Sequence, residues 1–152
     1  CGLSYEGLAW LTGTAVMLGG AWPGPYCLAL ALLYSVGAHG IMTLNDFKAI
    51  EGDVRMGVRS LPVTLGPDVA ARLACTVMAL AQALVIALLL VWGRPWHALA
   101  IAVLLVAQFW AMKTLLADPK GKAPWYNATG IGMYVSGMMI AAFALRSLGD
   151  MP

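Results

Sequence analysis

Long apolar runs, separated by short polar breaks, make up most of this chain. A helix needs about 20 apolar residues to cross the roughly 30 Å hydrocarbon core of a bilayer. Glycine and proline residues interrupt the runs at 22–25, 93–95 and 118–124, as they do in turns between helices. The pattern therefore predicts five membrane spans, at residues 3–21, 26–44, 69–92, 96–117 and 125–145. The predicted fold is all-α, a polytopic transmembrane helical bundle that forms a single membrane domain over residues 1–152.

The composition agrees with a protein that lies in a lipid bilayer. Hydrophobic residues make up 61% of the chain and charged residues only 11%, against about 25% charged residues in soluble domains. The net charge of +2, without a basic block, excludes nucleic acid as a partner. Three cysteines without CxxC spacing predict neither a disulfide framework nor a zinc site.

Six of the sixteen charged residues, both acids and bases, gather in one stretch, residues 45–66, which is the predicted motif loop between the second and third predicted spans. Lysine and arginine favour the cytoplasmic side of a membrane. Counted over alternate faces of the predicted bundle, seven basic residues stand against two. We therefore expect the charged stretch and the segment 118–124 to lie together on the cytoplasmic side.

Within the charged stretch, Asp46 and Asp53 are seven residues apart. On one continuous helix they would lie on nearly the same face, about 10 Å apart along the axis. Magnesium takes carboxylate oxygens and shares its shell with phosphate oxygens, and the nearby bases Lys48, Arg55 and Arg59 suit a diphosphate. The alternative is that Asn45 or Asp46 caps a helix and that the other charges form a solvated loop. The spacing alone leaves both interpretations open.

The sequence NDFKAIEGD at 45–53, followed by RSLPV at 59–63, resembles the second aspartate-rich motif of the UbiA-type intramembrane prenyltransferases. Many members of that family have a further aspartate at the position of Ala49, whereas the chlorophyll and bacteriochlorophyll synthases have a small residue there. The segments 2–10 and 118–139 are also similar to bacteriochlorophyll synthases. This resemblance implies the carboxyl-terminal half of a bundle of about nine spans. A first aspartate-rich motif would belong to the other half, so this half alone is expected to be inactive.

The resemblance also implies a reaction. Such an enzyme transfers a geranylgeranyl or phytyl group from its diphosphate to the propionate of bacteriochlorophyllide, with Mg²⁺ as the cofactor. The implied metal ligands are Asp46, Asp53 and Glu51, with Asp46 and Asp53 as the catalytic pair, and the implied diphosphate contacts are Asn45, Lys48, Arg55 and Arg59. Asn45 and Glu51 would be additional metal ligands or would orient the ligands. The alternatives are a quinone-ring or haem acceptor, or a non-catalytic membrane scaffold for pigment handling.

The expected location is the bacterial inner, or intracytoplasmic, membrane, beside other pigment-biosynthesis or photosynthetic membrane proteins. His39 precedes Asp46 by one to two turns and could face the same cavity, or it could be a neutral histidine satisfied by a neighbouring helix. Trp125, Tyr126 and Asn127 could close the cytoplasmic mouth over the substrate, or could include an aromatic anchor at the membrane interface.

Overall fold

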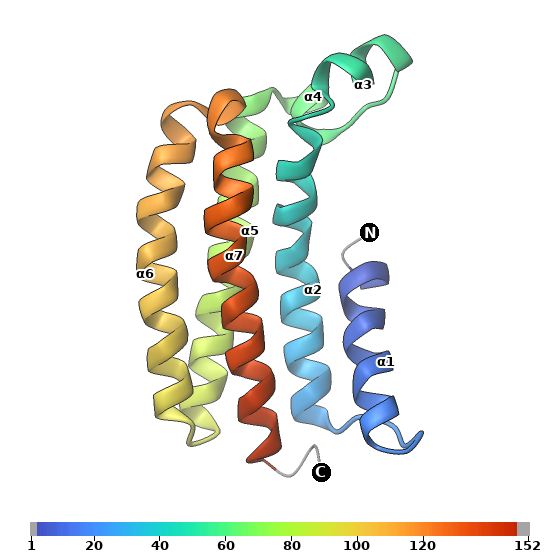
Figure 1. The fold of residues 1–152 in the computed structure, drawn as a ribbon, viewed down its shortest axis with the longest axis vertical. Helices are drawn as coiled ribbons and strands as arrows, with labels where there is room; N and C mark the ends of the chain where they lie inside the picture. The colour runs from blue at the N-terminus through green and yellow to red at the C-terminus, as the bar shows by residue number, and fades with distance from the viewer. Residues whose placement is uncertain (1–2, 149–152) are drawn as a thin grey trace.

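The computed structural model describes residues 3–148, which form a bundle of helices that run side by side (Figure 1). Its elements are a π-helical turn η1 (Leu3–Gly7) and helices α1 (Leu8–Met17), α2 (Pro25–Asp46), α3 (Ile50–Met56), α4 (Leu61–Leu65), α5 (Pro67–Val91), α6 (Pro95–Ala117) and α7 (Pro119–Arg146). No strand occurs among these residues. The predicted all-α fold class is confirmed.

Four of the helices, α2, α5, α6 and α7, are long and apolar enough to cross a membrane. They correspond to the last four predicted spans. The first predicted span, 3–21, contains only the ten-residue helix α1 after η1. Gly19 and Gly20 follow α1 with φ angles of 65° and 92°, a left-handed conformation that glycine adopts without steric cost and that cannot continue a helix. A fifth span therefore stays a prediction.

Helix α7 begins earlier than predicted, because residues 119–124 form its first turns instead of a loop. Asp118 caps the helix, and its Oδ1 accepts a hydrogen bond of 3.0 Å from the backbone N–H of Gly121. Pro119 occupies the first turn, where proline is favoured because its missing N–H would have no intrahelical partner. The prediction of a loop was wrong here because capping outweighed the composition.

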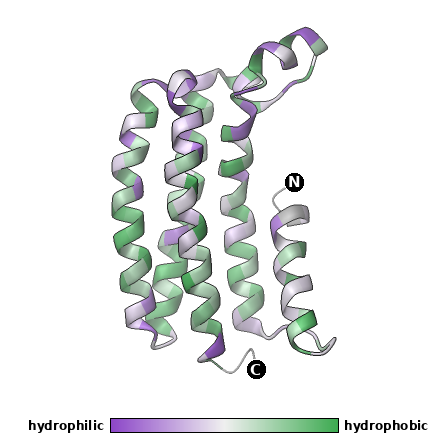
Figure 2. Ribbon diagram, in the orientation of Figure 1, coloured by the Kyte–Doolittle hydropathy of each residue, from purple (hydrophilic) through white to green (hydrophobic). Residues whose placement is uncertain are grey.

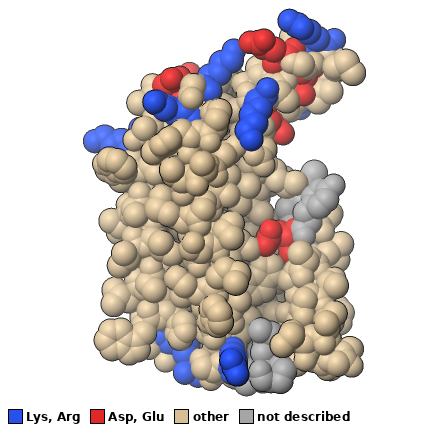
Figure 3. Space-filling model, in the orientation of Figure 1, with Lys and Arg blue, Asp and Glu red and all other residues tan. Residues whose placement is uncertain are grey.

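The stretch 45–66 is also more ordered than the predicted motif loop, since it contains the short helices α3 and α4. Both lie at the end of the bundle where α6 connects to α7 (Figure 1). Hydrophobic residues cover the middle of the long helices (Figure 2), whereas charged side chains gather mostly at the α3 end (Figure 3). The two polar segments therefore share one end, as the loop charges predict.

The core lies where α2 packs against α5 and α7, and where α5 and α7 pack against α6. Its largest fully buried side chains include Tyr34, Tyr134 and Met78. Gly40 allows α2 and α5 to approach closely, because a Cβ atom there would lie 2.6 Å from the carbonyl oxygen of Ala74. This packing holds the end of α2, and with it the charged stretch, beside α5 and α7.

Candidate functional site

The end of α2 carries the first two residues of the candidate site, Asn45 and Asp46. Phe47 follows them and is only 5% exposed, so it anchors the turn that leaves α2. Backbone hydrogen bonds from Lys48 N to Asn45 O (3.3 Å) and from Ala49 N to Asp46 O (2.9 Å) close this turn. The buried ring of Phe47 and this turn together hold the backbone of Asn45 and Asp46 in position.

Asp46 and Asp53 do not lie on one helix. Helix α2 ends at Asp46, a turn follows, and α3 begins at Ile50. The geometry considered for one continuous helix therefore does not apply to the two aspartates. The two carboxylates are nevertheless near enough for their negative charges to repel each other. Both residues are half-buried.

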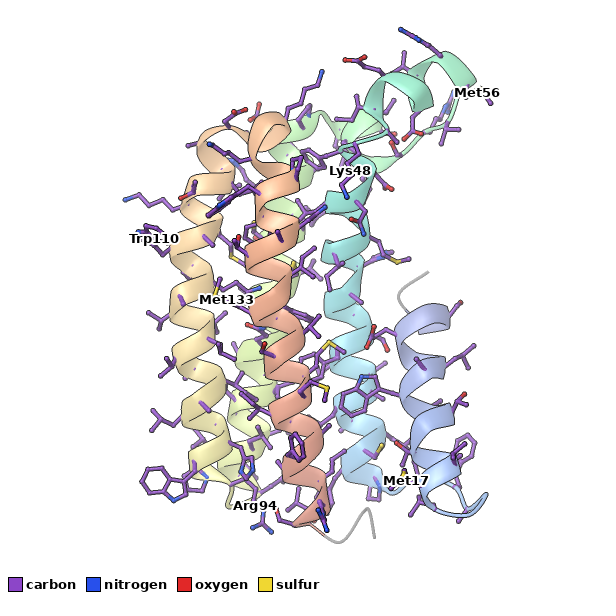
Figure 4. All side chains as sticks on the ribbon, in the orientation of Figure 1. Met17, Lys48, Met56, Arg94, Trp110 and Met133 are labelled. Carbon is purple, nitrogen blue, oxygen red and sulfur yellow. The ribbon has the colours of Figure 1, made fainter. Side chains whose placement is uncertain are left out.

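The predicted diphosphate contacts are exposed at the same end of the molecule. Lys48, Arg55 and Arg59 are all exposed, and Figure 4 labels Lys48 at the end of α2 and Met56 at the far end of α3. All three therefore face solvent at the end of the bundle that carries Asp46 and Asp53. The described residues contain no ion-pair partner for any of the three.

A hydrogen bond joins the charged stretch to α7. The Nδ2 of Asn127 donates to the Oδ1 of Asn45 across 3.0 Å. Asn127 was considered at the mouth of the site from the sequence, but its contact with Asn45 spans 82 positions of the chain and has no sequence signal. Its neighbour Tyr126 is completely buried, so the hypothesis that Tyr126 closes the mouth is wrong.

Glu51 forms an ion pair with Lys120 of α7, with 3.4 Å between Oε1 and Nζ. The side chains of Glu51 and Lys120 are 75% and 60% exposed, so water screens the pair and it adds about 0–1 kcal/mol to stability. The contact ties α3 to α7, a role that sequence reasoning missed. The role of Glu51 as a metal ligand stays a prediction.

His39 is exposed on α2, and the hydroxyl of Thr43 donates to its backbone carbonyl across 2.9 Å. No neighbouring helix within residues 3–148 provides a hydrogen bond to the imidazole. The structure therefore does not bring His39 together with the aspartates through any described contact.

The donor chemistry of the site fits magnesium. No group of three or more histidine, cysteine, aspartate or glutamate side chains within residues 3–148 could hold a metal ion alone. Magnesium, however, is commonly bound through one or two carboxylates together with water and substrate phosphates. Asp46 and Asp53 provide two such carboxylates, and a bound cation would relieve their mutual repulsion.

A bundle of long apolar helices with acidic and basic side chains concentrated at one end (Figure 3) is typical of a polytopic membrane protein. The model of the UbiA prenyltransferase family matches residues 1–145, and the chain belongs to this family. It is therefore part of a multi-pass membrane protein.

Several curated proteins are similar to the chain. It is 65% identical, over 99% of its length, to the bacteriochlorophyll synthase 33 kDa chain of Cereibacter sphaeroides, and covers 49% of that protein. It is 48% identical over 95% of its length to the bacteriochlorophyll synthase 34 kDa chain of Chloroflexus aurantiacus, and covers 46% of it. The chloroplastic chlorophyll synthase of Arabidopsis thaliana is 35% identical over 94% of the chain, which covers 36% of that relative. The chain thus spans about half the length or less of these relatives. No solved structure matches it.

Proposed function

We propose that this chain is one half of a bacteriochlorophyll synthase, which transfers a geranylgeranyl or phytyl group from its diphosphate to the propionate of bacteriochlorophyllide. The observation that carries this proposal is 65% identity, over 99% of the chain, to a bacteriochlorophyll synthase chain. The small residue Ala49 within the motif agrees with it. A quinone-ring or haem acceptor, or a scaffold without activity, is not favoured, because the relatives are named as synthases of bacteriochlorophyll or chlorophyll.

The reaction exchanges one carbon–oxygen bond for another. The bond between the allylic carbon of the prenyl group and the diphosphate oxygen breaks, and the electron pair leaves with the diphosphate. An oxygen of the propionate carboxylate then donates an electron pair to the allylic carbon and forms the ester. No proton transfer and no protein nucleophile are required, which suits a site built from acids, bases and amides.

Asp46 and Asp53 would hold Mg²⁺, and Asn45 and Glu51 would add ligands or orient them. When bound, the metal supplies positive charge that stabilises the departing diphosphate. Lys48, Arg55 and Arg59 would contact the remaining diphosphate oxygens through charge-assisted hydrogen bonds. Helices α3 and α4 would hold these groups over the end of the bundle, with the prenyl chain in the apolar part below.

The chain would lie in the bacterial inner, or intracytoplasmic, membrane, with the α3 end in the cytoplasm. The excess of lysine and arginine at that end supports this orientation. The water-soluble diphosphate would then leave on the cytoplasmic side. Other pigment-biosynthesis or photosynthetic membrane proteins would be its neighbours.

The test is ester formation by the full-length protein that carries this chain. Wild type and Asp53→Asn are supplied with bacteriochlorophyllide, geranylgeranyl diphosphate and saturating Mg²⁺ at equal folded amounts. We expect wild type to form the ester and the variant to lose at least about 100-fold in rate. Even the substitution of a residue that only hydrogen-bonds to a metal ligand typically lowers activity by about 10–100-fold.

The matched control is Asp68→Asn, which neutralises an exposed aspartate in the first turn of α5 and is expected to retain the wild-type rate. Equal rates for Asp53→Asn and wild type would remove Asp53 from the chemistry. Absence of ester with wild type would contradict the proposed function itself.

A further inference from the structure

Glu6 is an acidic residue in an apolar part of the chain, away from the charged end of the bundle. It lies in η1, eleven residues before the end of α1 at Met17, which is about 16 Å along a helix axis. In Figure 1 the start of α1 lies near mid-height of the long helices. If the long helices span the roughly 30 Å hydrocarbon core of a bilayer, a carboxylate at this height is costly, and such residues usually have a function.

The carboxylate of Glu6 has no ion-pair or hydrogen-bond partner within the part of the chain that the structure describes. The residue is half-buried. It is carried by a π-helical turn, a rare conformation that occurs frequently at functional sites. Among residues 3–148, no side chain competes with a ligand for the Glu6 carboxylate.

Glu6 lines an apolar groove of about 520 Å³ between α1 and α7, together with Trp10, Thr14, Met138 and Met139. This volume falls within the roughly 300–1,000 Å³ of small-molecule sites. Methionines are flexible and polarisable, so they can fit an irregular apolar ligand. Glu6 is the one ionisable group among the residues that line the groove.

Buried aromatic residues hold one wall of this groove in place. The ring of Trp10 stacks on Tyr34 of α2, with centroids 5.9 Å apart. Tyr34 in turn meets the edge of Tyr134, with centroids 5.6 Å apart. Tyr34 and Tyr134 are both completely buried. Tyr34 therefore holds the ring of Trp10 in place, and Tyr134 supports Tyr34.

We propose that this groove binds the macrocycle of the tetrapyrrole acceptor, and that the Glu6 carboxylate is an axial oxygen ligand of the magnesium at its centre. The inference rests on the proposed function. Magnesium prefers oxygen ligands, and a chelated magnesium ion has an open axial position above the plane of the ring. The apolar side chains of the groove match the flat, apolar faces of the macrocycle.

The position of the groove also suits the reaction. Asp46 lies 21 residues from the start of α2, about 30 Å along the axis. It is therefore roughly 15 Å nearer than Glu6 to the charged end of the bundle. Glu6 lies at the end of the groove nearest Asp46, because Thr14 and Met139 lie farther from the charged end along α1 and α7. The propionate arm of a macrocycle held at Glu6 would leave the groove past Glu6, toward the diphosphate site.

The experiment compares two pigments, bacteriochlorophyllide and its metal-free derivative, in binding titrations with the full-length protein in detergent. Wild type is expected to bind the magnesium pigment at least about tenfold more tightly than the metal-free pigment. The removal of one group around a bound metal commonly has an effect of this size. Glu6→Leu should abolish this preference and leave the affinity for the metal-free pigment unchanged within twofold. Glu6→His, which retains a ligand atom, should keep part of the preference, and Asp68→Asn should keep all of it.

The inference is overturned if wild type does not distinguish the two pigments, or if Glu6→Leu weakens both equally, which would make Glu6 a structural residue. The wild-type comparison and Glu6→His decide the matter if Glu6→Leu does not fold. Ester formation by the same wild-type preparation is measured in parallel. Ester without any metal preference contradicts only the role of Glu6, whereas absence of ester contradicts the proposed function.

Discussion

The hydrogen bond between Asn45 and Asn127 makes a quantitative prediction about catalysis. Asn45 immediately precedes Asp46 in the last turn of α2, and Asn127 belongs to α7. The bond should therefore hold the acidic end of α2 in position against α7. If the bond matters, removing either partner should impair the reaction by the same route, and the two substitutions should not be additive.

The expected coupling follows from the geometry of the bond. Its length of 3.0 Å between Nδ2 and Oδ1 is normal for an amide hydrogen bond. Neutral hydrogen bonds contribute about 0.5–1.5 kcal/mol, and Asn45 is exposed whereas Asn127 is half-buried, so the lower part of this range applies. A coupling energy of about 0.5–1 kcal/mol corresponds to a factor of roughly two to five in kcat/KM.

The assay is a double-mutant cycle on ester formation by the full-length protein, with Asn45→Ala, Asn127→Ala and the double variant at equal folded amounts. A control cycle pairs Asn45→Ala with Lys122→Ala, since Lys122 is exposed at the same end and has no described contact with Asn45. Additive effects of Asn45 and Asn127, within about 0.3 kcal/mol, would refute the reasoning. Equal coupling in the control cycle would do so as well.

Three further predictions concern stability, measured as the thermal unfolding midpoint of the full-length protein in detergent. Gly40→Ala should destabilise the protein by about 1–3 kcal/mol, because its Cβ would lie 2.6 Å from a backbone oxygen of α5. Gly132→Ala is the control and should not destabilise the protein, because its Cβ meets nothing within 4 Å. Equal unfolding midpoints for the two variants would contradict this packing. Asp118→Ala should cost about 1 kcal/mol through loss of the helix cap, whereas Asp118→Asn should retain most of the stability, and a midpoint unchanged by the alanine would argue against capping. Lys120→Gln should change stability by less than about 1 kcal/mol, because its ion pair with Glu51 is exposed; a larger loss that persists at high salt would show that the pair is not screened.

Asp46 and Asp53 illustrate where prediction from the sequence succeeded and failed. Their residue types and their place beside basic residues were sufficient to predict a charged site at one end of the bundle. The spacing of seven residues did not show their relative position, since α2 ends at Asp46 and Asp53 belongs to α3. The segment 119–124 was likewise predicted as a loop from its composition, but the cap at Asp118 extends α7 through it.

The sequence by itself determined the helical fold class, the approximate bounds of four long helices and the end at which charge gathers. The physical reason is that the thickness of a bilayer sets the length of an apolar run, and that this length and the charge of the breaks can be counted along the chain. Only the tertiary structure decided which distant residues meet: Asn45 with Asn127, and Glu51 with Lys120. It also decided that Glu6 faces a groove against α7. Such contacts depend on how neighbouring helices rotate and approach one another. The size of side chains at the helix contacts, as at Gly40, governs this approach, and no local sequence pattern reveals it.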